Sequence, residues 1–219
     1  MQIKARLLAL VALVLVFLAP PVRAESTSTE PAHEVVVEIM DAITGSTISD
    51  VETKIAAAKE AKQTELRVVI ESPGGDVISG LRIMRLLRDS GMHTTCQVEA
   101  LAASMAAILL ESPACQRRLV RPWSIVMFHE AAVGGQGREN EMAAALALLR
   151  ASNLSIAQIV APRLGISVED YQSLTSGGHE WWLVGVEGLQ KNFADEIVRQ
   201  DPSGTPSSST NPPDASNGL

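Results

Sequence analysis

The chain has 219 residues, of which 46% are hydrophobic and 20% charged, and its formal net charge is −7 at pH 7. This length suits one domain with a sizeable core. An acidic chain without a basic run is a poor binder of nucleic acid, so we expect no nucleic-acid partner.

The first 24 residues have the pattern of a secretory signal peptide. Lys4 and Arg6 form a short basic region, an apolar run covers residues 7–18, and residues 22–24 match a small-x-small cleavage site. The run is short for a membrane-spanning helix. We predict an exported protein, periplasmic or secreted, with an uncleaved membrane anchor as the alternative. After residue 24 we expect no stretch long enough to span a bilayer.

The remaining chain divides by composition into a linker, one domain and a tail. Residues 25–32 are polar and predict a linker, whereas residues 33–200 carry the apolar patterns of a folded domain. Residues 201–219 are rich in Ser, Pro, Asn and Gly and predict a disordered tail.

Within residues 33–200, strand and helix patterns alternate. In the helix predicted over residues 77–88, the residues expected to face the core are Ile78, Leu81, Leu87 and either Met84 or Ile83. The alternation predicts parallel strands joined by right-handed crossovers. In chain order we predict strand 34–40, helix 46–62, strand 66–70, helix 77–88, strand 93–98, helix 100–110, strands 117–120 and 124–128, helix 139–161, helix 168–174, helix 186–192 and strand 193–198.

Three predicted strands are followed by residues that could carry chemistry. The sequence Ser-Pro-Gly-Gly at residues 72–75 exposes backbone N–H groups, Ser104 lies in an Ala-rich turn, and His129 ends an apolar strand. Sites in parallel α/β folds lie at the carboxyl ends of strands, which favours one shared site. Taken alone, Ser104 is more simply interpreted as a small residue packed among alanines.

Together, the Ser-Pro-Gly-Gly motif, the Ala-Ala-Ser-Met-Ala turn around Ser104 and the Val-Met-Phe-His strand end resemble the proteolytic subunit of Clp protease. The motifs stand in the family's order, and the step of 25 residues from Ser104 to His129 matches it. The resemblance covers roughly residues 33–198 and implies an α/β, ClpP/crotonase-like fold of repeated strand–helix units with a long handle-like helix.

The resemblance implies a serine peptidase that cleaves peptides or unfolded chains. Ser104 would be the nucleophile, His129 the general base, and the N–H groups of Gly75 and Met105 the oxyanion hole. The family's aspartate matches Glu180 when a two-residue insertion is allowed, and Gly178 without it. A peptide would bind as an added strand; the residues expected to hold it are Gly74, Val77, Ile78, Val133, Gly134 and Gly135.

The resemblance also implies partners. Helix 139–161 matches the handle that joins subunits, so we expect a homo-oligomer, although the helix could instead pack on its own core. Because export separates the chain from ATP, we expect no ATPase partner, and we expect no cofactor and no metal.

Three questions stay open at this stage. Cys96 and Cys115 could form a disulfide, because a strand–helix–strand unit can place them on neighbouring strands, or remain buried thiols. If Glu180 lies on the surface, Ser104 and His129 form a dyad or an inactive relic. The competing functions are an inactive oligomeric scaffold and an acyl-CoA-binding crotonase relative.

Overall fold

The structure, a computed structural model, describes residues 35–132, 134 and 136–199. The predicted signal peptide, linker and tail lie outside these residues, as do Val133 and Gly135.

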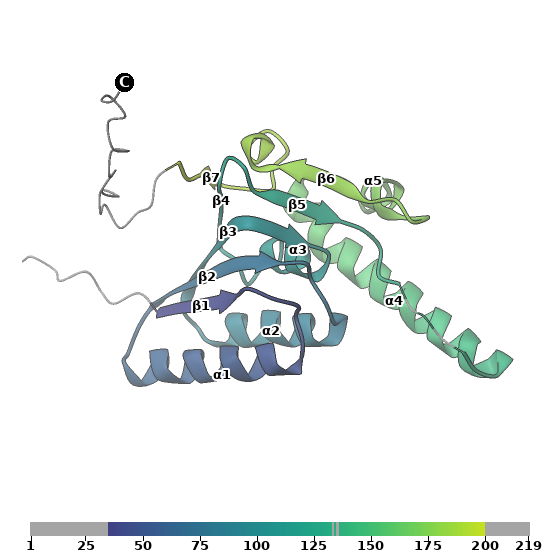
Figure 1. The fold of residues 1–219 in the computed structure, drawn as a ribbon, viewed down its shortest axis with the longest axis horizontal. Coiled ribbons are helices and arrows are strands. Elements are labelled where there is room, and N and C mark those ends of the chain that lie inside the picture. Colours follow the sequence, from purple (N-terminus) through teal and green to yellow (C-terminus); the bar gives the residue numbers. More distant parts are fainter. Residues whose placement is uncertain (1–34, 133, 135, 200–219) are drawn as a thin grey trace, which may run out of the picture. The chain divides into compact units, whose positions relative to one another are not determined.

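A seven-stranded sheet forms the centre of the described domain (Figure 1). Its main path runs β1-β2-β3-β4-β7, and β5 pairs with β3 and with β6. All pairs are parallel except β5–β6. The strands are β1 Val35–Ile39, β2 Glu65–Ser72, β3 His93–Ala103, β4 Arg117–Val120, β5 Ile125–Phe128, β6 Trp181–Val184 and β7 Glu196–Ile197.

Helices connect the parallel strands, as the alternating pattern predicts. In Figure 1, α1 and α2 lie side by side under one face of the sheet, and α4 runs out beyond the sheet. The helices are α1 Gly45–Glu60, α2 Val77–Asp89, α3 Met105–Leu110, α4 Glu139–Leu164 and α5 Val168–Thr175, with a 3-10 turn at Gly185–Glu187.

Local sequence explains how α2 is placed after β2. Leu66, Val68 and Ile70 alternate into the core along β2. Asp76 then caps α2, because its Oδ1 accepts hydrogen bonds from the N–H of Ser79 at 2.7 Å and from the Ser79 hydroxyl at 2.6 Å. The cap fixes where the chain turns from strand to helix, and thereby positions the Gly-Gly turn between them.

Two predicted helices are wrong. The segment predicted as helix 100–110 continues β3 to Ala103, and only Met105–Leu110 is helical. Residues 101–103 pair with β5, so tertiary pairing overrides the helix propensity of the alanines. The segment predicted as helix 186–192 is the 3-10 turn at Gly185–Glu187 followed by turns, since Gly188 packs against Ala194 and Val120 and bends the chain back toward the sheet.

The prediction that Ile78 faces the core is also wrong. Its side chain is 65% exposed, whereas Ser79, Gly80, Ile83, Met84 and Leu87 form the buried face of α2. Gly80 allows a close approach of α3, because an added Cβ would overlap the side chain of Met105. The buried face of α2 is therefore the one that carries Gly80 and Ile83, and Ile78 lies on a different face.

The long helix α4 is buried only near its C-terminal end. It continues through Pro162 to Leu164 and ends at Gly165, which has φ 71°. Its buried residues are Ile156, Ala157, Val160, Ala161 and Leu164. By length and composition it could cross a membrane, with a mean hydropathy of 1.5 over its most apolar window, only 17% of which is buried. The expectation that no stretch after residue 24 is long enough to span a bilayer is therefore wrong. Arg150 is the only charged residue between residues 142 and 162 of this helix.

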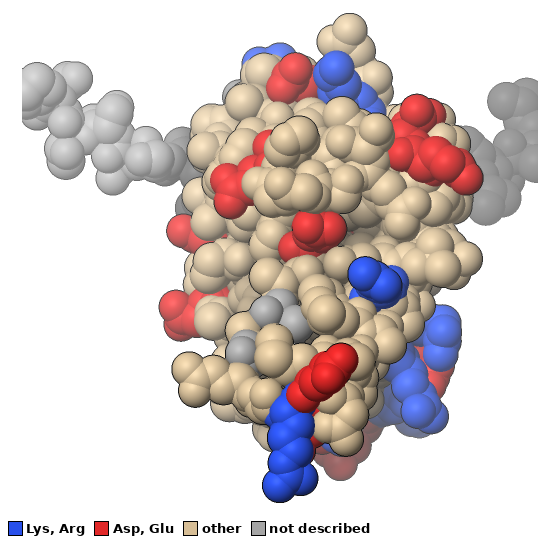
Figure 2. Space-filling model, turned by 90° about the vertical axis from the view of Figure 1, so that its right-hand side faces the viewer, with Lys and Arg blue, Asp and Glu red and all other residues tan. Residues whose placement is uncertain are grey.

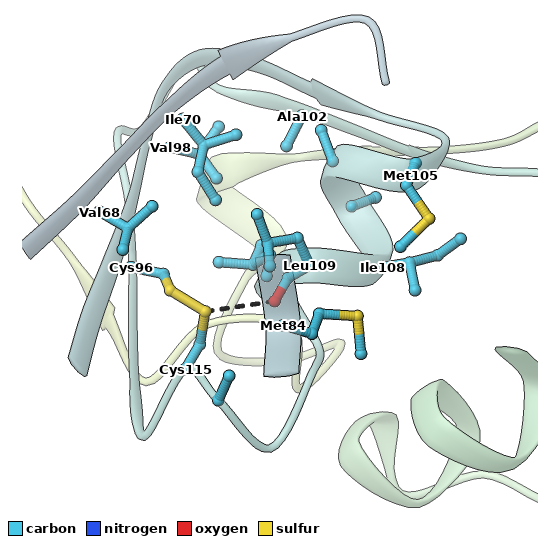
Figure 3. Packing of buried hydrophobic residues seen from close by; sticks show 14 of the residues in the cluster. Val68, Ile70, Met84, Cys96, Val98, Ala102, Met105, Ile108, Leu109 and Cys115 are labelled. Atoms are coloured by element: carbon cyan, nitrogen blue, oxygen red, sulfur yellow. Dashed lines mark hydrogen bonds between the residues drawn. A yellow bond between two sulfur atoms is a disulfide. The ribbon is translucent and has the colours of Figure 1, made fainter. Parts of the chain in front are cut away.

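Cys96 and Cys115 form a disulfide inside the core (Figure 3). Cys96 lies on β3 and Cys115 just before β4, with 5.5 Å between their Cα atoms. Both residues are fully buried, and the Sγ of Cys115 lies 3.2 Å from the Leu109 carbonyl oxygen. The bridge closes the segment that contains Ser104 and α3.

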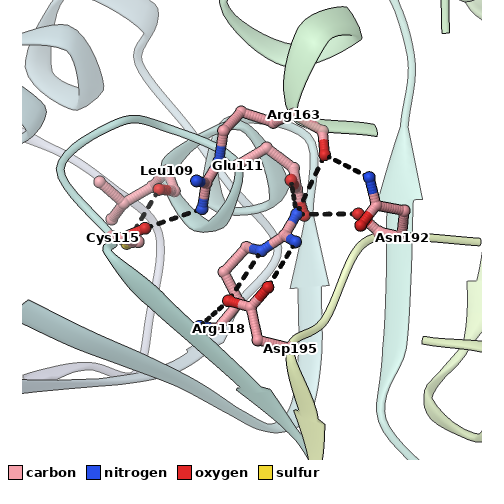
Figure 4. Close-up of polar contacts among 7 residues, drawn as sticks. All are labelled: Leu109, Glu111, Cys115, Arg118, Arg163, Asn192 and Asp195. Atoms are coloured by element: carbon pink, nitrogen blue, oxygen red, sulfur yellow. Dashed lines mark hydrogen bonds and ion pairs between the residues drawn. The ribbon is translucent and has the colours of Figure 1, made fainter. Parts of the chain in front are cut away.

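A buried ionic network ties the C-terminal segment to α3 and β4 (Figure 4). Arg118 donates to Glu111 at 2.5 Å and forms two hydrogen bonds with the carboxylate of Asp195. The same guanidinium donates to the Asn192 carbonyl at 2.8 Å. Because Glu111 and Arg118 are both buried, removal of Arg118 would leave a buried carboxyl group without its ion-pair partner, whereas Arg118 without Glu111 would still be paired with Asp195.

Candidate functional site

The residues predicted to carry chemistry lie at the carboxyl ends of three neighbouring strands. Ser72 ends β2, Ser104 follows β3, and His129 follows β5. β3 pairs with both β2 and β5, so these three ends lie at one edge of the sheet. This is the edge at which parallel α/β folds place their ligands.

Ser104 stands in a strained turn between β3 and α3. Its backbone has φ 54° and ψ −123°, which is rare for a residue other than glycine. Its N–H donates a 2.8 Å hydrogen bond to the carbonyl of Met127 on β5. Side chains held in such turns are over-represented at functional sites, and this half-buried serine is open to solvent.

The Gly-Gly turn packs directly against Ser104. A Cβ added to Gly74, which has φ 93°, would lie 2.5 Å from the carbonyl oxygen of Ala103 and 2.7 Å from the Cβ of Ser104. No side chain fits between these backbones, so glycine is required for both its conformation and the contact. The structure thus brings residue 74 and the serine together.

Two backbone N–H groups at this contact are candidates for oxyanion donors. Met105 is the first residue of α3, so its N–H has no partner within the helix. In the Gly-Gly turn, the N–H of Gly74 donates to the Ser72 hydroxyl at 3.1 Å and that of Asp76 to the Ile43 carbonyl at 2.9 Å. The N–H of Gly75 between them donates no hydrogen bond among the described residues.

His129 is half-buried at the end of β5, two residues beyond the carbonyl of Met127 that Ser104 contacts. Within residues 35–132, 134 and 136–199, its imidazole forms no hydrogen bond with the chain. The next residue is anchored to the end of α5: the N–H of Glu130 donates to the Thr175 carbonyl, and its carboxylate accepts from the N–H of Gly177, both at 3.1 Å.

Glu180 lies opposite His129 on the neighbouring segment, but its carboxylate binds Trp182. β5 and β6 are antiparallel with Phe128 opposite Trp181, so the next pair along the two chains is His129 and Glu180. The Glu180 Oε2 accepts a 3.1 Å hydrogen bond from the Trp182 indole N–H. Among the described residues no hydrogen bond joins Glu180 to His129, and its role stays a prediction.

The predicted peptide-binding residues are placed in part. Gly74 is buried, Val77 is half-buried and Ile78 is exposed, all beside the strand ends. Gly134 is exposed with open space around it. Figure 2 shows acidic and basic side chains interspersed on one face of the domain, with broad uncharged areas between them.

The contacts that support His129 were not predicted from the sequence. Asn153 of α4 contacts the backbone of Ala131, and a cavity of about 40 Å³ is lined by His129, Asn153, Tyr171 and Thr175 among others. No local motif indicates these contacts, because they join residues more than 20 positions apart. In the part of the chain that the structure describes, no group of three or more His, Cys, Asp or Glu side chains could hold a metal ion.

Comparison with known proteins connects this geometry to one family. The model of the Clp protease family matches residues 23–201. The "ATP-dependent Clp protease proteolytic subunit 2" of Tropheryma whipplei (strain Twist) is 27% identical over 133 residues, which are 61% of this chain and 73% of the relative. The subunit of the same name from Rhodococcus jostii (strain RHA1) is 25% identical over 154 residues, 68% of this chain and 78% of the relative.

Other relatives are matched over a smaller part of their length. The "ATP-dependent Clp protease proteolytic subunit" of Porphyromonas gingivalis (strain ATCC BAA-308 / W83) is 25% identical over 137 residues, and the alignment spans 61% of it. The mixed α/β architecture agrees with the fold class predicted from the motifs.

Proposed function

The chain belongs to the Clp protease family, and we propose that it hydrolyses peptide bonds through an acyl-enzyme formed on Ser104. The relatives named above are called Clp protease proteolytic subunits, which supports a serine peptidase at the level of the family. The observation that carries the proposal is the strained Ser104 turn, packed on the Gly-Gly turn at the same sheet edge as His129. The proposed substrates are short peptides or already unfolded chains.

The proposed first step is attack of the Ser104 hydroxyl on the peptide carbonyl. His129 takes the hydroxyl proton as the C–O bond forms, and the carbonyl oxygen becomes an oxyanion between the N–H groups of Gly75 and Met105. Loss of one such donor typically costs on the order of a hundredfold in rate. His129 then gives the proton to the leaving amine as the C–N bond breaks.

The second step hydrolyses the acyl-enzyme and regenerates the free enzyme. Water attacks the acyl carbonyl while His129 takes its proton, and the proton passes to Ser104 as the ester bond breaks. Glu180 is the proposed orienting carboxylate. For that role its side chain must leave the Trp182 indole and turn toward His129, a change that substrate binding could supply because catalytic hydrogen bonds often tighten only in the complex.

An inactive oligomeric scaffold is the second candidate. It is supported by the lack of a hydrogen bond among Ser104, His129 and Glu180 in the described residues, and by the exposed apolar surface of α4. Nothing in the geometry favours acyl-CoA binding over these two.

We also propose export and independence from an ATPase. The signal-like N-terminus and the buried Cys96–Cys115 disulfide both suit an oxidising compartment. The relatives named above are called ATP-dependent, so this chain would differ from them in working without an unfoldase. Co-purification with an ATPase would contradict this proposal.

Labelling and hydrolysis together test the peptidase proposal. We expect a fluorophosphonate probe to label Ser104 and the protein to cleave members of a panel of short fluorogenic peptides. Because a triad acts as a unit, Ser104→Ala, His129→Ala and the double variant should fall to a similar low residual rate. Ser49→Ala on the exposed side of α1 is the matched control and should keep full activity.

The outcomes separate the two candidates. Wild-type activity in Ser104→Ala would overturn the nucleophile assignment. A wild-type protein that neither reacts with the probe nor cleaves any peptide would favour the scaffold. Glu180→Gln should lower the rate by less than His129→Ala if Glu180 only orients the imidazole, and should have no effect if it does not.

A further inference from the structure

The backbone that follows His129 is held by a side chain from a distant helix. The Ala131 N–H donates a 2.8 Å hydrogen bond to the Oδ1 of Asn153, and the Asn153 amide nitrogen lies 3.4 Å from the Ala131 carbonyl oxygen, to which it donates. One carboxamide therefore contacts both polar groups of one residue, 22 positions away in the sequence.

The position of Asn153 in α4 is not explained by the helix itself. Asparagine is a poor residue for a helix interior, and there it often bonds its own backbone. Here the carboxamide turns away from its helix and satisfies Ala131 instead. The residue is also half-buried, so its hydrogen bonds compete less with water than those of an exposed side chain.

Because a cavity lies beside His129, these hydrogen bonds hold the backbone that follows it. His129, Asn153, Tyr171 and Thr175 line a cavity of about 40 Å³. Where side chains leave such a space, close packing does not fix the neighbouring backbone, and discrete hydrogen bonds must do so. Glu130 is held by the end of α5, and Ala131 by Asn153.

We propose that Asn153 is a positioning residue, which fixes the backbone after His129 and thereby the placement of the imidazole relative to Ser104. The proposal rests on the peptidase function proposed above. A general base must lie within hydrogen-bond reach of the proton that it takes, and displacement of a catalytic group by about 1 Å can cost on the order of a hundredfold in rate. Asn153 would act through His129 and would not touch the substrate.

The first measurement needs no catalytic activity. Amide hydrogen exchange at Ala131, followed by NMR in the full mature chain, should become at least about tenfold faster in Asn153→Ala because the acceptor is lost. Asn153→Asp keeps an oxygen that accepts the Ala131 N–H and should remain close to the wild type. Gln190→Ala removes an exposed carboxamide outside α4 and is the matched control.

The second measurement concerns the reaction. In Asn153→Ala we expect kcat to fall by about tenfold to a hundredfold, since the base is displaced, while KM reports separately on the predicted peptide-binding residues that follow Ala131. Asn153→Asp should recover most of kcat because its carboxylate still accepts the Ala131 N–H, and Gln190→Ala should leave both constants unchanged. If Asn153→Ala does not fold, Asn153→Ser, which is too short to reach Ala131, replaces it in both measurements.

The results distinguish this inference from the function on which it rests. Unchanged Ala131 exchange in Asn153→Ala would overturn the backbone contact. Faster exchange with unchanged kcat, or an equal loss of kcat in Asn153→Asp, would overturn the positioning role. A wild type without peptidase activity would instead overturn the proposed function and the positioning role together, while the exchange measurement would still decide the contact.

Discussion

At the scale of single residues, the site depends on backbone conformations that few side chains permit. Ser104 adopts a positive φ despite its Cβ, at a cost on the order of 1–3 kcal/mol that the surrounding structure must offset. Gly74 and Gly75 adopt positive φ as well, and the space beside Gly74 is filled by Ala103 and Ser104. The strain and the contact occur at the same place.

Gly74→Ala tests this arrangement. The new methyl group would overlap Ala103 and Ser104, so we expect loss of probe labelling at Ser104 together with destabilisation by more than the roughly 1–3 kcal/mol of backbone strain alone. Gly91→Ala is the matched control, because Gly91 has φ 77° and open space around it. Labelling yield and urea denaturation are measured for both. Equal effects of the two substitutions would show that crowding at Ser104 has no part.

At the scale of elements, the buried network joins α3, β4 and the segment before β7. Burial raises the pKa of Glu111 to about 7, against the opposing attraction of Arg118. The pKa of Asp195 is lowered through its hydrogen bonds with Arg118, which outweigh the effect of burial. Glu111 terminates α3, the helix that begins at Ser104, so its protonation state bears on an element of the site.

We predict a pH dependence of stability that comes from Glu111. Its pKa in the folded chain lies above the unfolded value of 4.5, so the folded state holds the proton more tightly. The contribution of Glu111 to the free energy of unfolding should therefore be largest below about pH 4.5 and should be lost as the pH rises to about 7. Urea denaturation across this range measures the slope, and Glu111→Gln should remove it.

Asp89→Asn serves as the control for this prediction, because Asp89 lies outside the network. Its pKa is lowered by hydrogen bonds with Arg88 and Arg85, so its contribution is lost only as the pH falls below the usual range of an aspartate, outside the window assigned to Glu111. The assignment to Glu111 fails if the wild type and Glu111→Gln show parallel slopes between pH 4.5 and 7.

At the scale of the whole molecule, the described part of a single chain leaves much of the apolar surface of α4 uncovered. Large apolar side chains are exposed along its N-terminal part, of which Leu148 is the most open at 65%. Such a surface on a soluble chain usually marks an interaction site. Together with the family membership, this exposure supports the proposed homo-oligomer, in which α4 would pack against another copy of the chain.

Leu148→Glu should therefore lower the oligomeric state. Burial of a carboxylate at an apolar interface is costly, so we expect light scattering at micromolar concentration to show a smaller mass for this variant than for the wild type. Leu189→Glu, at a leucine that is 57% exposed outside α4, is the matched control. A monomeric wild type would rule out the oligomer, and an equal effect of both variants would move the interface away from α4.

The sequence by itself determined the features that local patterns encode. Alternation of apolar residues located β2, apolar periodicity located α1 and α2, and the spacing of motifs indicated the family and the shared edge of Ser104 and His129. These predictions succeeded because a strand or helix leaves its period in the sequence wherever one of its faces is buried.

Only the tertiary structure decided what depends on distant partners. Residues 101–103 look helical but form a strand because β5 lies beside them, and Ile78 is exposed because α3 packs on the Gly80 side of α2. The bond between Asn153 and Ala131 likewise has no local signal. Local propensities are worth less than about 1 kcal/mol per residue, so the pairing and packing of distant segments override them.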